Sequence, residues 1–191
     1  MTFRPPHHSR RWESFGPWIR PPGNGPIILG CNGSDASTQA IQAARDWVTG
    51  LDVVLVTATT GRHRLGHSTV MHDALKADAY LLTDAAITDE HLRSAREAML
   101  RAGATSVRVV TDVGDPVTVL SGVAARLGAE VVVVGMNRRP SWLARALRRR
   151  MDDDIGLVVT DGTTHLRARR RAGAVATRRP ATIPQVGLAH P

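Results

Sequence analysis

A glycine-containing turn near the start of the sequence has residue types that could contact a ligand. It reads Gly30–Cys31–Asn32–Gly33–Ser34 and directly follows a short apolar run. Glycine lets a backbone approach a ligand closely, and asparagine and serine side chains offer hydrogen bonds. We therefore take Gly30, Asn32, Gly33 and Ser34 as candidate binding residues. The alternative is that the turn only caps the following helix, which is the commoner role of such turns.

A second candidate segment begins at Gly135, the residue after an unbroken run of four valines. Arginines follow at positions 138, 139, 145 and 148–150. Guanidinium groups bind phosphate in a bidentate manner, so Arg138, Arg148 and Arg149 are candidate phosphate ligands. The alternative is a solvated basic helix face that pairs with the acidic residues 152–154, because charge runs usually lie in solvent.

Other residues with reactive side chains form no complete catalytic or metal-binding set. His63 and His67 could share a helix face, and His72 follows, but no carboxylate or cysteine completes a metal site with them. Cys31 stands at the end of an apolar run and is expected to be a small buried hydrophobe rather than a nucleophile. We find no nucleophile–base pair and no paired carboxylates. The protein is therefore expected not to be an enzyme.

Five apolar runs, separated by helical patterns, must position these residues. Strands are predicted at 27–31, 51–58, 106–111, 130–134 and 155–160. Helices are predicted at 36–48, near 70–79, and at 89–100, 116–127 and 141–150, with a poorly patterned connection at 59–87. Strands without polar alternation are typical of a parallel sheet that is buried on both faces. The fold class is therefore α/β with an open parallel sheet, and ligands are expected at the carboxyl ends of its strands.

The charge distribution divides the chain into a central domain and two basic ends. The net charge is +8, and the excess comes from arginines in residues 1–25 and 162–191, whereas 26–161 is nearly neutral. We predict a Pro/Arg-rich N-terminal arm at 1–25, one folded domain at 26–161 and a basic disordered tail at 162–191. Aromatic residues in the arm leave open that it packs on the domain or on a partner.

The single cysteine and the hydropathy pattern bear on the compartment. One cysteine excludes an intramolecular disulfide, which suits a reducing environment. No apolar run approaches the roughly 18 residues of a membrane span, and the first residues have no apolar segment of the signal-peptide type. We therefore expect a cytoplasmic protein without membrane contact.

The segment from Pro26 to Asp161 resembles the universal stress protein domain. Four pieces carry the likeness: IILGCNGSDAS, VVLVTA, VGDPVTVLSGVAARLGAEVVVVG and a closing LVV strand. The resemblance implies a five-stranded parallel sheet in the order 3-2-1-4-5 with helices on both faces, a Rossmann-like fold of the adenine nucleotide alpha hydrolase type. It also implies a homodimer, which in this family often forms through the last strand.

Members of that family that bind ATP carry Gly-x-x-Gly-x9-Gly-Ser/Thr after the fourth strand. Here Gly135 matches the first glycine, Arg138 stands at the second, and Arg148 and Arg149 stand at the last two positions. The family's acidic residue near the adenosine is Asn32 here. The resemblance therefore implies a degenerate nucleotide site that keeps no cofactor.

Three functions follow as hypotheses. The first is a non-enzymatic stress-response protein that acts by dimerisation or by binding an unknown protein partner. The second is a domain that binds a nucleotide, or hydrolyses ATP weakly, through the arginine-rich loop. The third is an RNA- or DNA-associated protein that contacts phosphates through its basic ends, although the C-terminal arginine run has no aromatic side chains to stack on bases.

Overall fold

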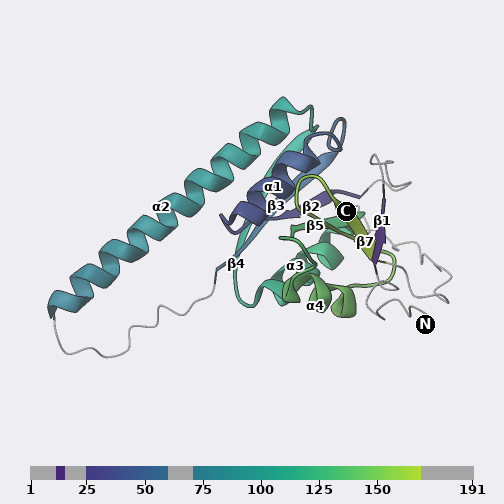
Figure 1. Ribbon diagram of the computed structural model, residues 1–191. Coiled ribbons are helices and arrows are strands. Elements are labelled where there is room, and N and C mark those ends of the chain that lie inside the picture. Colours follow the sequence, from purple (N-terminus) through teal and green to yellow (C-terminus); the bar gives the residue numbers. More distant parts are fainter. Residues whose placement is uncertain (1–11, 16–24, 60–70, 169–191) are drawn as a thin grey trace, which may run out of the picture.

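The computed structural model describes residues 12–15, 25–59 and 71–168, with backbone alone at 71–85. Figure 1 shows its strands and helices. The strands are β1 (Trp12–Ser14), β2 (Ile27–Gly30), β3 (Asp52–Thr59), β4 (Ser106–Val113), β5 (Val131–Gly135), β6 (Gly156–Thr160) and β7 (His165–Ala168). The helices are α1 (Asp35–Ala44), α2 (Met71–Arg101), α3 (Pro116–Leu127) and α4 (Trp142–Arg150). None of the described helices is both long enough and apolar enough to cross a membrane.

The strands form one sheet in the order β1-β7-β6-β5-β2-β3-β4. The five predicted strands pair in parallel and in the predicted 3-2-1-4-5 order, with Leu29 beside Leu55 on one side and Val133 on the other. The sheet is wider than predicted, because β7 and β1 add two antiparallel strands beyond β6. The prediction of a five-stranded, wholly parallel sheet is therefore corrected at one edge.

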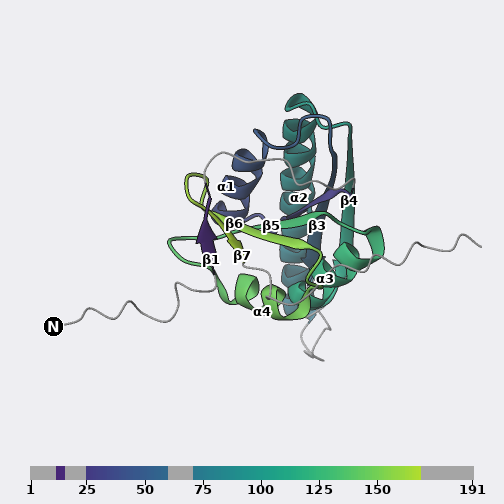
Figure 2. The same cartoon turned by 90° about the vertical axis from the view of Figure 1, so that its right-hand side faces the viewer.

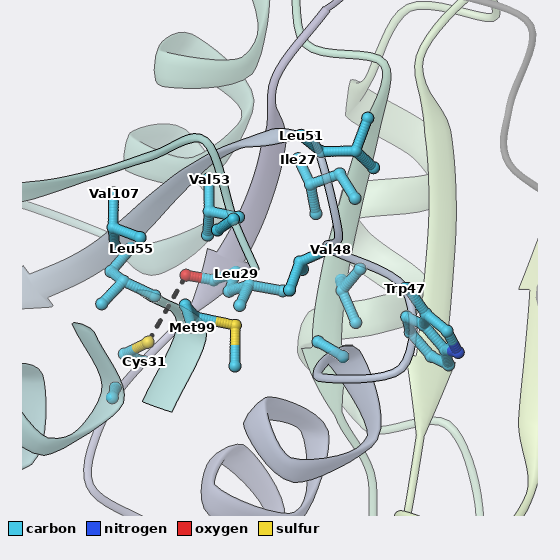
Figure 3. Close-up of a cluster of buried hydrophobic side chains, with 14 of the residues drawn as sticks. Ile27, Leu29, Cys31, Trp47, Val48, Leu51, Val53, Leu55, Met99 and Val107 are labelled. Carbon is cyan, nitrogen blue, oxygen red and sulfur yellow. Dashed lines mark hydrogen bonds between the residues drawn. The ribbon is translucent and has the colours of Figure 1, made fainter. Parts of the chain in front are cut away.

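Alternate residues of the central strands fill two separate cores, one on each face of the sheet. Ile27 and Leu29 face α1 and α2, where they pack with Met99 (Figure 3). Ile28, between them, faces α3 and α4 and packs with Leu147. Figure 2 shows the two helix pairs on opposite sides of the sheet. Burial on both faces explains why these strands are uniformly apolar.

The described parts of the two predicted ends meet at one sheet edge. We call β1 and β7 the terminal strand pair; Trp12 lies opposite Ala168, and Ser14 lies opposite Leu166. Trp12 and Leu166 pack against the core beneath α3 and α4. The predicted domain limits of 26–161 are therefore too narrow, since 12–14 and 165–168 belong to the sheet. The prediction for 1–11, 16–24 and 169–191 lies outside the described residues.

A tight hairpin holds β7 against β6. The Asp161 carboxylate accepts hydrogen bonds from the Thr163 backbone N–H (3.1 Å), the Thr163 hydroxyl (3.0 Å) and the Thr164 backbone N–H (2.7 Å). These donors, with Thr164 first, lower the pKa of Asp161. Gly162 has a φ of +95°, a conformation that glycine adopts without a steric penalty. The turn therefore fixes the register in which β7 joins the sheet.

His165 lies between aromatic rings from two distant segments. Its ring contacts Trp47 edge-on, with ring centroids 4.9 Å apart, and the Phe15 ring at 5.8 Å. Its Nδ1 is 2.7 Å from the Thr160 hydroxyl, and Phe15 donates a backbone hydrogen bond to its carbonyl oxygen. The terminal strand pair is thus attached through side chains as well as through the backbone ladder.

Helix α2 is a single element of 31 residues, where the sequence predicted a short helix near 70–79 and a separate one at 89–100. The whole span lacks glycine and proline. Thr88 and Asp89, at the expected start of the second helix, are helix-interior residues, which costs only a few tenths of a kcal/mol each. Conversely, α1 ends at Ala44 rather than near Val48, and a turn follows it.

Candidate functional site

The carboxyl ends of β2 and β5 define the candidate site. The chain runs from β2 to β3 on one side and later returns to β5 on the other, so strand order reverses between them. In open α/β sheets ligands bind at this reversal, and we use the word crevice for the place where the turn after Gly30 and the connection after Gly135 lie next to each other. The structure therefore brings the turn after Gly30 next to Gly135, as the sequence predicted.

The turn after β2 is organised by hydrogen bonds among its own side chains. The Asn32 side-chain oxygen accepts from the Ser34 backbone N–H (3.2 Å) and hydroxyl (2.7 Å). The Ser34 hydroxyl oxygen in turn accepts from the Ser37 N–H (3.3 Å) and caps α1. Gly33 has a φ of +72°. The helix-capping role is thus present, and it occupies the acceptor side of Asn32.

Cys31 points into the core rather than into the crevice. Its thiol donates to the Leu29 carbonyl oxygen at 3.5 Å, as the dashed line in Figure 3 shows. Burial raises the pKa of this thiol to about 12. A thiol that stays protonated is a poor nucleophile, because the thiolate is the reactive form. The interpretation of Cys31 as a small buried hydrophobe is confirmed.

Gly30 and Gly135 are glycines because neighbouring elements pack closely against them. A Cβ on Gly135 would lie 2.1 Å from the Ala36 carbonyl oxygen and 2.8 Å from the Ser37 backbone nitrogen, both in the first turn of α1. A Cβ on Gly30 would lie 3.1 Å from a Val134 methyl group. The Gly135 contact is with backbone, so no side-chain rotation can relieve it. Close packing therefore explains Gly135 without a ligand.

The connection from Gly135 to α4 is short. The Met136 side chain is buried, and its backbone N–H donates to the Thr160 carbonyl oxygen at 2.8 Å. Arg138 is exposed. Ser141 then caps α4, accepting from the Ala144 N–H at 3.3 Å. Arg138 is thus the candidate arginine that the structure leaves beside the crevice.

Arg148 and Arg149 lie in the last turn of α4, not beside Gly135. Since β5 and β6 are parallel, the chain must run back from the carboxyl ends of the strands to their amino ends through α4 before β6 begins. Nine helical residues span about 13 Å. Counting along the family motif therefore placed these two arginines at the wrong end of the helix, because the connection before α4 is too short for the motif's spacing.

Three residues near the crevice were not among the predicted site residues. Ser141 is the cap of α4, and its signal was a Pro-Ser pair just before the helical pattern. Asp35 is the acidic residue in the first turn of α1. The His91 ring from α2 lies 3.7 Å from where a Gly33 Cβ would stand, a tertiary contact with no local signal in the sequence.

The histidine cluster considered in the sequence lies mainly outside the described residues. His63 and His67 lie outside the described residues, and only the backbone of His72 is described. Across the ranges that the structure does describe, no group of three or more His, Cys, Asp or Glu side chains could hold a metal ion.

Solved structures share this architecture. A universal stress protein in complex with cAMP superposes with a TM-score of 0.51 at 23% identity, covering 72% of this chain and 98% of that chain. A universal stress protein family protein from Arabidopsis thaliana with AMP bound gives a TM-score of 0.53 at 11% identity, covering 71% and 91%. At these identities the likeness establishes the fold alone.

Sequence comparison gives the family. Two universal stress proteins from strains of Mycobacterium tuberculosis are each 32% identical to this chain over 111 residues, which is 57% of this chain and 73% of theirs. The model of the universal stress protein family matches residues 23–155. The match covers more than half of the sequence and includes both turns of the crevice, so the chain belongs to the universal stress protein family.

Proposed function

We propose that this universal stress protein is a non-enzymatic stress-response protein that acts through protein contacts, and that its crevice binds nucleoside triphosphates weakly. The observation that carries the second part is the contact between Gly135 and the backbone of α1. This glycine is needed to let α1 pack, so its presence is no sign of a retained phosphate loop.

The backbone around Gly135 supports weak binding. Phosphate loops hold their ligand through free backbone N–H groups. Here the Met136 N–H is used by β6, and the short connection leads directly into the Ser141 cap. Each lost hydrogen bond to a charged phosphate removes roughly 1.5–3 kcal/mol. The loss of two or three such bonds would therefore weaken a triphosphate complex by several orders of magnitude.

The charges at the crevice offset one another. The N-terminus of α1 attracts anions, but the Asp35 carboxylate already occupies its first turn. Arg138 supplies positive charge from an exposed position. Exposed ion pairs contribute only about 0–1 kcal/mol each, so this arginine cannot replace a set of backbone donors.

Calorimetric titration with ATP, AMP and cAMP at physiological salt tests the proposal. The last two ligands are included because solved relatives hold them. We expect a dissociation constant for ATP of at least hundreds of micromolar. Arg138→Ala changes the arginine beside the crevice, and Arg149→Ala, at the far end of α4, is the matched control. Low-micromolar binding that is lost in the first variant and kept in the second would establish the arginine-loop hypothesis instead.

Gly135→Ala tests the packing role directly. The new methyl group would overlap the Ala36 carbonyl, so we expect a loss of about 3 kcal/mol or more in the free energy of unfolding, without any nucleotide present. Gly122→Ala, in the interior of α3 with no atom within 4 Å of its Cβ position, is the control. There we expect a gain of about 0.5–1 kcal/mol. Equal, small effects in both would mean that Gly135 is not held for packing.

A further inference from the structure

The outer edge of β4 carries the pattern of a strand that pairs with a second copy of itself. β4 is the last strand on its side, and no strand of the described ranges pairs with its outer edge. It is eight residues long. Val109 is 42% exposed and Val113 is 69% exposed, which is unusual for valines in a strand. A long, exposed, apolar edge strand is a template for pairing with another chain.

The charges on β4 are self-complementary. Arg108 and Asp112 are both exposed and lie on the same face of the strand, two residues to either side of Val110. An antiparallel pair of β4 strands related by a two-fold axis at Val110 would place Arg108 of each copy directly opposite Asp112 of the other. Opposite charges facing each other across an antiparallel pair stabilise it, and like charges destabilise it.

The same register matches the apolar residues. It places Val110 opposite its own copy, Val109 opposite Thr111, and Val107 opposite Val113. Pairing would therefore cover the exposed Val113 side chain with a residue that already belongs to the core. An isologous contact of this kind closes at two copies and does not propagate into a fibre.

The opposite edge is not available for the same purpose. β6, which corresponds to the last strand of the family fold, is paired with β5 on one side and β7 on the other. A second copy could pair with β6 only by displacing β7 and the hairpin contacts of Asp161 and His165. The outermost strand there, β1, offers only three residues.

We propose that the chain forms a two-fold homodimer by antiparallel pairing of β4 strands, centred on Val110, which continues the sheet across two copies. This specifies the homotypic contact within the proposed function. Nucleotide titration tests binding at the crevice, and sedimentation velocity tests the β4 dimer. The weak-binding proposal and the dimer proposal can therefore fail independently.

Charge reversal tests the dimer. Sedimentation velocity measures the dissociation constant of the wild-type chain, of Arg108→Asp, of Asp112→Arg and of the double variant. Each single reversal places like charges opposite each other twice per dimer, and we expect it to weaken association on the order of tenfold. The double reversal restores both pairs and should return the constant to near the wild-type value. Both substituted positions are exposed, and circular dichroism checks that each variant is folded.

Cysteine cross-linking tests the register independently. Directly opposite residues in an antiparallel pair have Cα atoms about 4.5–5.5 Å apart, within reach of a disulfide. Arg108→Cys and Asp112→Cys chains should cross-link on oxidation mainly when mixed, and little when alone. A chain that is monomeric at all concentrations would overturn the proposal, as would a dimer insensitive to the single reversals. Dissociation of the dimer by Trp12→Ala, with no effect of reversal at β4, would place the contact at the terminal strand pair and would also overturn it.

Discussion

The two edges of the sheet end in opposite ways. At one edge the terminal strand pair closes the sheet with a three-residue outer strand, and the Glu13 carboxylate lies 3.6 Å from the Arg167 guanidinium across it. At the other edge an eight-residue strand ends the sheet with two exposed valines. Short edge strands resist pairing with other chains, whereas long ones with exposed apolar side chains invite it. We call the first the closed edge and the second the open edge, and this difference supports the proposed pairing at β4.

Removing the Trp47 ring, which contacts His165 at the closed edge, should have the largest effect on the free energy of unfolding. Trp47 is 7% exposed, and its ring contacts the His165 ring edge-on. We expect Trp47→Ala to lower the free energy of unfolding in urea by about 3–5 kcal/mol. Trp142→Ala is the matched control, since Trp142 is 60% exposed on α4, and it should cost about 0.5 kcal/mol or less. Similar losses in the two variants would contradict the support assigned to Trp47.

A leucine-to-alanine pair compares the two edges themselves. Leu166 on β7 packs partly buried against the core beneath α3 and α4, and Leu100 lies on α2, the helix that contacts β4, and is 41% exposed. We expect Leu166→Ala to cost about 1–2 kcal/mol and Leu100→Ala about 0.5 kcal/mol or less, measured by urea unfolding. A larger loss at Leu100 would mean that the open edge is the better packed of the two.

Stability at alkaline pH tests the burial of Cys31, which lies at the centre of the sheet between the two edges. The pKa of Cys31 rises from 9.0 to about 12 through burial, so the unfolded chain ionises first. The stability that comes from burying the neutral thiol is fully present below pH 9 and is lost as the pH rises toward 12. At pH 10 the loss relative to pH 7 is about 1.4 kcal/mol. Cys31→Ala should lack this part of the slope in stability against pH; identical slopes in both proteins would refute the burial of the thiol.

Acid pH distinguishes the closed edge from the open one, with the smallest expected effect. The pKa of Asp161 is lowered by its hydrogen bonds to Thr164 and Thr163. The carboxylate therefore stabilises the hairpin above its ordinary pKa of 3.8, and this support is lost as pH falls through the lowered value. Amide exchange at Thr164 should accelerate over that window in the wild-type chain. In Asp161→Asn the exchange should show no such step, and β4 should show none in either protein.

The centre of the fold was predictable because its strands are defined by local pattern. The runs at Ile27–Leu29 and Val131–Val134 are apolar without alternation, and the reversal of strand order placed Gly30 beside Gly135 as expected. The terminal strand pair was not predictable. Its strands are three and four residues long, and each exists only because the other end of the chain supplies its partner.

In the candidate site, too, the features set by local sequence were predictable and those set by tertiary packing were not. The cap at Ser34 and the buried Cys31 follow from residue type and neighbours. The positions of Arg148 and Arg149 did not follow, because motif counting assumes a loop length that this chain lacks. The role of Gly135 depends on where α1 packs, which is a tertiary fact.

The pairing of Trp12 with Ala168 also has a consequence for synthesis of the protein. The two residues are about 150 positions apart, so β1 leaves the ribosome long before its partner exists. At 5–20 residues per second the delay is about 8–30 seconds. During that time β1 has no strand to pair with, and its backbone hydrogen-bonding groups are open to other chains. The closed edge is therefore the last part of the sheet to complete its strand pairing. A chain released before residue 165 would lack β7, and the outer side of β6 would stay unpaired.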